Sequence, residues 1–204
     1  MNIHMEGLIV DGTLGDGGHT EFILKNTGPK IRVLGIDRDL SAVDRAKERL
    51  RPFKHRIKLV HGSLENLRDL AGQSGITKIN GLLLDFGVSS PQLDTPERGF
   101  SIRNNGPLDM RMDSSQTTTA ANLLEKLKDA ELVSIIKNFG EERFAKKIVR
   151  AIRREQQKKP IITTSHLSGI ISGVVRSPKY SRIHPATKTF QALRIAVNLS
   201  LIHI

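Results

Sequence analysis

The stretch GLIVDGTLGDGGH, residues 7–19, decides the fold class of this chain. Its first four residues are mostly branched and apolar, which predicts a buried strand. The glycines after Asp11 permit tight turns and a close approach of the backbone to a ligand, and we expect a helix directly after them. A strand, a glycine-rich turn and a helix in this order open a βαβ unit, so the stretch predicts an α/β fold with a parallel sheet.

The residues that follow continue this alternation of strand and helix up to about residue 90. Residues 40–50 have the apolar spacing of a helix, and Ser41 with Asp44 predicts a capping box at its start. Three further apolar runs are β-branched and leucine-rich, as in strands that are covered on both faces. These predicted strands are 31–36, 57–60 and 79–84.

The character of the sequence changes after about Asp113. Residues 117–138 and 141–157 predict helices with no strand between them, and the Ser-, Gly- and Pro-rich residues 165–185 predict short pieces. A last helix is expected from near Pro185. We therefore expect a Rossmann-like sheet with an inserted small helical domain. The predicted division is 1–113 for the α/β core, 114–183 for the helical insertion, and 184–204 for a helix that returns to the core.

Asp37 stands at the end of the second predicted strand, about 20 residues after the glycines, as in dinucleotide-binding folds. An acid there can accept hydrogen bonds from ribose hydroxyls, so glycines and acid together predict an adenosine-type cofactor. The spacing Gly12-x-x-Gly15-x-Gly17-Gly18 departs from the dinucleotide fingerprint and favours S-adenosylmethionine over NAD. A plain tight turn beside a solvated acid, and an NAD-dependent oxidoreductase, stay open as alternatives.

The fourth predicted strand ends in a polar loop, Asp85–Asp94, at the edge of the sheet where the carboxyl ends of parallel strands border a ligand crevice. We expect Asp85, Ser89, Ser90 and Pro91 to carry the chemistry, with Asp85 as a hydrogen-bond acceptor. An ordinary turn capped by an aspartate is the alternative.

Six blocks of the sequence resemble the MraW/RsmH family in their order and spacing, from about residue 9 to Asn198. The resemblance implies an S-adenosylmethionine-dependent methyltransferase that acts on the N4 amino group of a cytidine in the decoding region of small-subunit (16S) ribosomal RNA. The blocks are Asp11–His19, Asp85–Asp94, Glu97–Ser101, Gly106–Asp113, Phe139–Ala145 and His184–Arg194.

The resemblance also implies how the chemistry is done. A cytosine amine is a poor nucleophile because its lone pair is delocalised, so an enzyme contributes hydrogen-bond acceptors and in-line placement against the sulfonium methyl. Asp85 would accept from the cofactor or the amine, and Ser89 and Ser90 would orient a base splayed into the crevice. The implied cofactor contacts are Gly17, Gly18, His19, Asp37, Asp85, Gln92 and Leu64, where an aromatic residue is common; the glycine spacing adds Gly15.

The charge of the chain favours a polyanionic partner. It carries 32 Lys and Arg against 21 Asp and Glu, a net charge of +11. The predicted helix 142–154 is two-faced, with Phe144, Ile148, Val149 and Ile152 on its apolar side. The other side would suit an RNA backbone, although a solvated face is the alternative. Its basic residues are Arg143, Lys146, Lys147, Arg150 and Arg154, and Lys188 and Arg194 are weaker candidates of the same kind.

The block 106–113 holds a second set of candidates for RNA contact. Asp109 and Asp113 could bracket the target base, while Arg111 pairs with one of them or with a phosphate. An internal loop pinned by Arg–Asp pairs explains the same residues equally well.

Several classes of protein are disfavoured. Without cysteine the chain can form neither disulfides nor a thiolate metal site, and its histidines lack metal-ligand spacing, so we expect no metal. No apolar run could span a bilayer. We expect a cytoplasmic protein whose partner is small-subunit rRNA or the 30S subunit; its oligomeric state stays open. A non-catalytic RNA-binding or ribosome-assembly module is the alternative function.

We expect the chain to be a piece of a longer protein, because the family continues beyond the last helix into further strands. The final residues, 199–204, differ from the polar continuation common in the family, and we expect them to derive from a sequencing adapter. The sheet would then be incomplete, with strand 79–84 lacking one neighbour. An unpaired apolar edge invites aggregation, so we expect poor expression and little activity.

Overall fold

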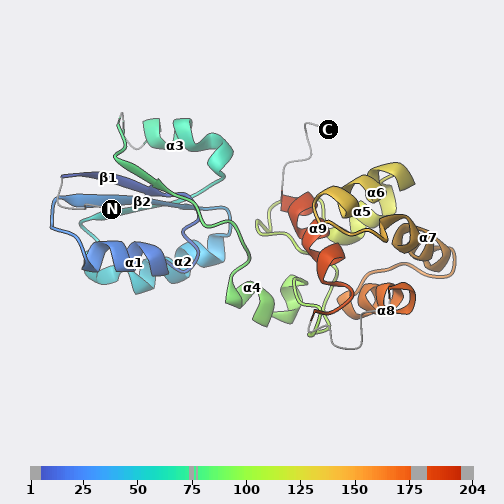
Figure 1. The fold of residues 1–204 in the computed structure, drawn as a ribbon. Helices are drawn as coiled ribbons and strands as arrows, with labels where there is room; N and C mark the ends of the chain where they lie inside the picture. The colour runs from blue at the N-terminus through green and yellow to red at the C-terminus, as the bar shows by residue number, and fades with distance from the viewer. Residues whose placement is uncertain (1–5, 74–75, 77, 176–182, 199–204) are drawn as a thin grey trace. The chain divides into compact units, whose positions relative to one another are not determined.

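The computed structural model describes residues 6–73, 76, 78–175 and 183–198 (Figure 1). Contacts between residues divide the chain into two compact units, Met1–Ser89 and Ser90–Ile204. Each unit buries its own set of apolar side chains.

The first unit is a parallel sheet with helices on both faces, which confirms the predicted α/β fold. The strands lie in the order β3-β2-β1-β4, and each neighbouring pair is parallel. All four predicted strands are present, as β1 (Gly7–Asp11), β2 (Ile31–Asp37), β3 (Ile57–His61) and β4 (Gly81–Leu83). Between them lie α1 (Gly18–Lys25), α2 (Leu40–Arg49), η1 (Arg51–Phe53), η2 (Leu64–Asn66) and α3 (Leu67–Gln73).

Two apolar clusters hold the helices on this sheet. Helices α1 and α2 lie on one face of the sheet and α3 on the other (Figure 1). Side chains alternate between the faces of a strand, so Ile9 and Val33 pack with α1 and α2, whereas Val10 and Leu34 pack with α3. A fully buried Val, Leu or Ile contributes roughly 1.5–3 kcal/mol. The alternation therefore sets the register, because a slip of one residue would exchange the two faces.

β4 is shorter than the predicted strand 79–84. It pairs with β1 only from Gly81 to Leu83, and just before it the Asn80 side chain accepts the Leu8 amide at 2.9 Å in place of a backbone carbonyl. Within the part of the sheet that the structure describes, β4 pairs with β1 alone, and Leu82 is 48% exposed. An apolar edge is thus present, while the poor expression expected from it stays a prediction.

The predicted capping box of α2 is wrong. The helix begins at Leu40, and Asp39 is its N-cap: the carboxylate accepts the Ser41 amide at 3.1 Å and the Ser41 hydroxyl at 2.6 Å. An N-cap acceptor must stand one residue before the first helical turn. Ser41 lies inside that turn and is therefore the donor.

The second unit is helical in the residues that the structure describes. Its first elements are α4 (Ser90–Asp94) and η3 (Pro96–Arg98). The single helix predicted over 117–138 is wrong, because Leu127 is extended and divides it into α5 (Ala120–Lys126) and α6 (Asp129–Asn138). The Arg153 guanidinium donates to the carbonyls of Leu124 and Leu127, which satisfies the end of α5. Arg153 itself belongs to α7 (Ala145–Gln156), the core of the predicted helix 141–157.

The prediction of short pieces over 165–185 is also wrong in its first part. α8 (Thr164–Val174) is a regular helix, capped by the Thr163 hydroxyl, and Leu167 and Ile171 are buried on its inner face. Gly169 and Gly173 face open space, so the missing side chains of these two helix-weakening residues leave no gap in the packing. Residues 176–182 lie outside the described residues. The last helix, α9 (Thr187–Asn198), follows Pro185 as predicted, and residues 199–204 lie outside the description.

The contacts group residues 90–113 with the helices that follow them. Leu108 donates its amide to Ile162 O, Thr164 donates its amide to Gly106 O, and Met112 donates its amide to the Asn198 side chain. The division at 113/114 and 183/184 that the sequence predicts stays a prediction.

Candidate functional site

The glycine turn between β1 and α1 has a backbone that only glycine adopts readily. Gly15 and Gly17 have φ values of 51° and 79°, in the left-handed region. Gly17 is also the N-cap of α1, and a Cβ there would lie 3.0 Å from the Leu50 side chain and 3.3 Å from that of Ala46. The turn is therefore held close against α2 and its C-cap residue, Leu50.

Asp37, at the carboxyl end of β2, is tied to this turn. One carboxylate oxygen accepts the Gly15 amide at 2.7 Å, and the other accepts the Asp39 amide at 2.9 Å. Burial raises the pKa of Asp37, although these two hydrogen bonds oppose the rise. A carboxylate has about four acceptor positions, so lone pairs remain on both oxygens. The Asp37 carboxylate can therefore accept further hydrogen bonds, which suits the pair of hydroxyls on a ribose.

Asp11 is a polar residue of this region whose role the sequence reasoning missed. It is fully buried, accepts the Thr20 hydroxyl at 2.6 Å and the Thr13 amide at 3.3 Å, and its pKa is raised by burial. The signal was available, because an acid that ends a buried strand needs donors, and a threonine hydroxyl stands nine residues further on, at Thr20. Asp11 thus fastens the start of the turn to α1.

The loop after β4 is fastened to the same turn. The Asp85 amide donates to the Thr13 hydroxyl at 2.6 Å. The Asp85 carboxylate lies 3.9 Å from His19 Nδ1, and both side chains are more than 60% exposed. The structure therefore brings together Gly15 with Asp37 and His19 with Asp85, and we call these four residues, with Gly17 and Gly18, the strand-end site.

Leu64 forms an apolar wall beside this site. A Cβ on Gly12 would lie 2.3 Å from a Leu64 methyl carbon, so the absence of a side chain at Gly12 is what admits Leu64. Ser63 caps η2 immediately before it. An aliphatic side chain here can cover the face of an adenine but cannot stack on it as an aromatic ring would.

The division between the two units falls within the remaining predicted chemistry residues. Ser89 ends the first unit, whereas Ser90 and Pro91 open α4 in the second, where Gln92 is buried. Their approach to Asp85 stays a prediction.

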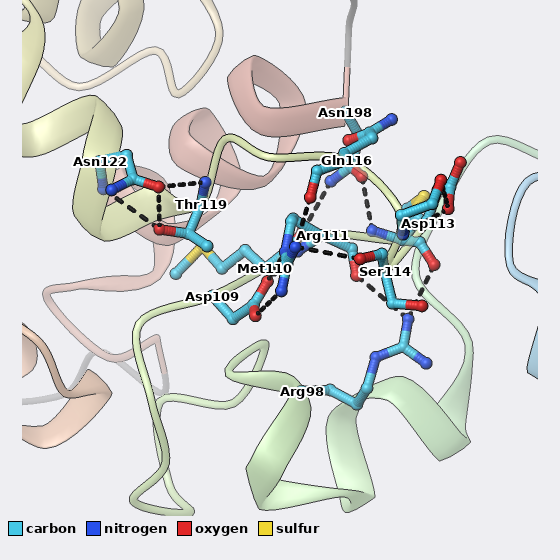
Figure 2. Close-up of polar contacts among 12 residues, drawn as sticks. Arg98, Asp109, Met110, Arg111, Asp113, Ser114, Gln116, Thr119, Asn122 and Asn198 are labelled. Carbon is cyan, nitrogen blue, oxygen red and sulfur yellow. Dashed lines mark hydrogen bonds and ion pairs between the residues drawn. The ribbon is translucent and has the colours of Figure 1, made fainter.

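The loop that carries Asp109, Arg111 and Asp113 is held by its own hydrogen bonds (Figure 2). Arg111 binds both carboxylate oxygens of Asp109, at 2.7 and 2.8 Å, and its remaining outer nitrogen donates to the carbonyls of Ser114 and Gln116. Burial acts to raise the pKa of Asp109, but the hydrogen bonds and charge of Arg111 outweigh it and lower that pKa. This is the internally pinned loop that the sequence left open; contact of the loop with RNA stays a prediction.

Two further side chains clamp the backbone of this loop. Asn198 donates to Met110 O at 2.8 Å and accepts the Met112 amide at 2.7 Å, and Arg98 donates to Arg111 O and Met112 O (Figure 2). Met110 between them is buried with φ at 65°, a conformation that costs a non-glycine residue of order 1–3 kcal/mol. We call residues 109–113 with Arg98 and Asn198 the clamped loop.

The basic side of α7 is exposed as predicted, and Ile148, Val149 and Ile152 are buried on the other side. Phe144 is an exception to the predicted apolar side: it precedes the helix, is 37% exposed, and lies under the Arg143 guanidinium at 4.7 Å. In the part of the chain that the structure describes, four cations of this face form no ion pair with an acid. They are Lys146, Lys147, Arg150 and Arg154.

The two weaker basic candidates differ from this face. Lys188 donates to Glu141 O at 3.0 Å. Arg194 is partly buried, and burial lowers the pKa of its guanidinium. Their contact with RNA stays a prediction.

Among the described residues, no three or more His, Cys, Asp or Glu side chains cluster so that they could hold a metal ion. The same residues contain no helix long and apolar enough to cross a membrane.

The fold and the strand-end site define an α/β protein of the class that binds a nucleoside-like cofactor over a glycine turn, with an acid on the next strand. The sequence profile described as the MraW methylase family matches residues 1–204. The chain belongs to this family.

Curated relatives agree over almost the whole chain. "Ribosomal RNA small subunit methyltransferase H" of Trichlorobacter lovleyi is 54% identical over 196 residues, which cover 96% of this chain and 63% of that protein. The protein of the same name from Thermobifida fusca is 46% identical over 195 residues, covering 95% and 59%. The chain thus spans about three-fifths of the length of these relatives.

A solved structure, fibrillarin of Aeropyrum pernix with bound S-adenosyl-L-methionine, is 12% identical, with a TM-score of 0.37 over 76% of this chain and 59% of that one. This likeness is too low to support an argument.

Proposed function

We propose that the protein transfers a methyl group from S-adenosylmethionine to the N4 amino group of a cytidine in the decoding region of small-subunit ribosomal RNA. The observation that carries the proposal is 54% identity, over 96% of this chain, to a relative named as a small-subunit ribosomal RNA methyltransferase. Small-subunit rRNA or the 30S subunit is the proposed partner, and the cytoplasm, where that subunit is made, is the proposed location.

The strand-end site supports S-adenosylmethionine as the cofactor. Asp37 keeps lone pairs for the ribose hydroxyls, Leu64 offers an apolar cover for adenine, and Gly15, Gly17 and Gly18 place no side chains of their own on the turn. Bound there, S-adenosylmethionine would supply an electrophilic methyl group on its sulfonium.

The residues after β4 are the proposed catalytic group. Asp85 is exposed, and its backbone is held by Thr13, so its carboxylate is placed to accept a hydrogen bond from the cofactor or from the cytosine amine. Ser89, Ser90 and Pro91 are proposed to orient the base, and Gln92 to contact the cofactor. The basic side of α7, with Asp109, Arg111, Asp113, Lys188 and Arg194, is proposed to contact the RNA.

The test identifies the nucleoside that is methylated. The full-length protein is incubated with small ribosomal subunits that lack the modification and with labelled S-adenosylmethionine, and the digested RNA is analysed. N4-methylcytidine, lost in Asp85→Ala, is the expected result. Label on another nucleoside would overturn the substrate, and cofactor binding without any label would favour the non-catalytic RNA-binding module.

A further inference from the structure

A concave surface lies away from the strand-end site. A cavity of about 440 Å³ is lined by the first halves of β1, β2 and β3 and by residues next to them. Leu8, Leu34 and Ile76 of its wall belong to the apolar cluster on the α3 face of the sheet. The strand-end site is at the carboxyl ends of the same parallel strands, so the cavity is at the opposite end of the sheet.

The wall of this cavity is basic and carries no acid. It includes Arg32, Arg56, Lys58 and Lys78. Leu34 of β2 pairs with Lys58 of β3, so Arg32, two residues before Leu34, is the diagonal neighbour of Lys58 on the same face. Diagonal neighbours on a sheet lie about 7–8 Å apart, within reach of long side chains, and like charges brought together on one face are unfavourable. An anion in the cavity would relieve that repulsion.

Three of these cations are available to a ligand. Arg56 is fully used inside the unit, because its guanidinium donates to the carbonyls of Leu24, Gly28 and Ile31. The exposed side chains of Arg32, Lys58 and Lys78, in contrast, form neither a hydrogen bond nor an ion pair with any residue that the structure describes.

We propose that this amino-end groove, defined by Arg32, Lys58 and Lys78, binds the phosphate backbone of RNA. A guanidinium can bind a phosphate through two parallel hydrogen bonds, and the ammonium groups add point charges beside it. A concave wall of one charge sign concentrates the potential that attracts a polyanion. The inference rests on the proposed function and adds to it an interaction that positions the RNA without reading its bases.

The first experiment compares two variants that lose the same charge. One combines Arg32→Gln, Lys58→Gln and Lys78→Gln; the control combines Lys47→Gln, Arg51→Gln and Lys54→Gln, exposed cations of α2, η1 and the residue after η1. Binding of a fluorescein-labelled single-stranded RNA is measured by anisotropy over a series of KCl concentrations. We expect the groove variant to bind about tenfold more weakly and its salt slope to fall by about 0.7 for each phosphate that the protein no longer neutralises. An equal weakening in the control would show that overall charge alone matters, and would overturn the proposal.

A measurement on the unchanged protein covers the case in which the groove variant misfolds. Lysine acylation is followed by mass spectrometry with and without the RNA, and we expect protection of Lys58 and Lys78 but not of Lys47 and Lys54. Equal reactivity of Lys58 and Lys78 in both samples would overturn the proposal. So would binding of inorganic phosphate at the groove, seen by calorimetry, without any RNA protection. Both readouts are independent of methyl transfer, so an inactive protein would overturn the proposed function and leave this inference standing.

Discussion

The strand-end site and the clamped loop are both rich in polar side chains, but they differ in how many of their polar atoms already form hydrogen bonds within the protein. Asp37 accepts two backbone amides and keeps lone pairs free, whereas the Arg111 guanidinium is engaged by Asp109, Ser114 and Gln116. A residue that spends most of its donors on its own loop contributes to stability. A residue that retains acceptors beside a bare glycine turn can bind a ligand.

The largest effect expected from this difference is on cofactor affinity. Asp37→Ala removes two ribose acceptors, each worth about 1.5–3 kcal/mol as a hydrogen bond to a charged group. We expect binding of S-adenosylhomocysteine, measured by isothermal titration calorimetry, to weaken by about 100-fold or more. Asp44→Ala, the same change on the exposed side of α2, is the matched control and should bind normally. Normal binding by Asp37→Ala would mean that the glycine turn is not the cofactor site.

The clamped loop should respond in stability instead. Arg111→Met removes the two-point pair with Asp109 and the donors to two carbonyls, and we expect the free energy of unfolding to fall by about 2 kcal/mol. Urea denaturation followed by circular dichroism measures the change. Arg103→Met, at an exposed arginine of the same unit, should leave the midpoint in place. An unchanged midpoint in Arg111→Met would show that the loop does not depend on the pair.

The stabilising contributions of Asp109, in the clamped loop, and of Asp11, which fastens the glycine turn beside the strand-end site, should change with pH in opposite directions. The pKa of Asp109 is lowered in the folded state, so its stabilisation is present above its unfolded value and is lost as the pH falls through the folded value. The pKa of Asp11 is raised by burial, so its contribution is most favourable below the unfolded value and is lost as the pH rises through the folded value.

Urea midpoints of the two asparagine variants between acid and neutral pH check this expectation. Asp109→Asn should destabilise the protein at neutral pH. Its stability should then fall less between neutral and acid pH than that of the parent protein. Asp11→Asn should remove a charge penalty that the parent carries at neutral pH and not in acid. The same pH trend in both variants would contradict the assigned environments.

The smallest effect concerns a hydroxyl that has no partner. Thr189 on α9 is fully buried, and its hydroxyl has no hydrogen-bond partner among the described residues. An unsatisfied buried polar group lowers stability by about 1–3 kcal/mol, and replacing it by an apolar side chain of the same shape removes part of that cost. Thr189→Val should therefore raise the free energy of unfolding by about 1 kcal/mol. A decrease in stability would reveal that the hydroxyl has a partner in solution.

Much of the fold could be read from the sequence, because the relevant signals are local. The strands β1 to β4 follow from apolar runs, and the position of Asp37 follows from its place at the end of one of them. The errors lie where a distant residue decides. The helix α5 ends at Leu127, where Arg153 of α7 binds the Leu127 carbonyl. The helix α8 forms despite two glycines because the face that carries Leu167 is buried.

The sequence by itself determined the parallel sheet, the glycine turn and the family, since hydrophobic periodicity and motif spacing are properties of neighbouring residues. Only the tertiary structure decided which polar groups are already bonded and which remain available. It showed that Thr13 holds the Asp85 backbone across 72 residues of chain, that Asn198 and Arg98 hold Met110 and Arg111 in the clamped loop, and that Arg32 and Lys58 share one sheet face. Hydrogen bonds and charge pairs between distant residues depend on three-dimensional proximity, and no local pattern encodes that.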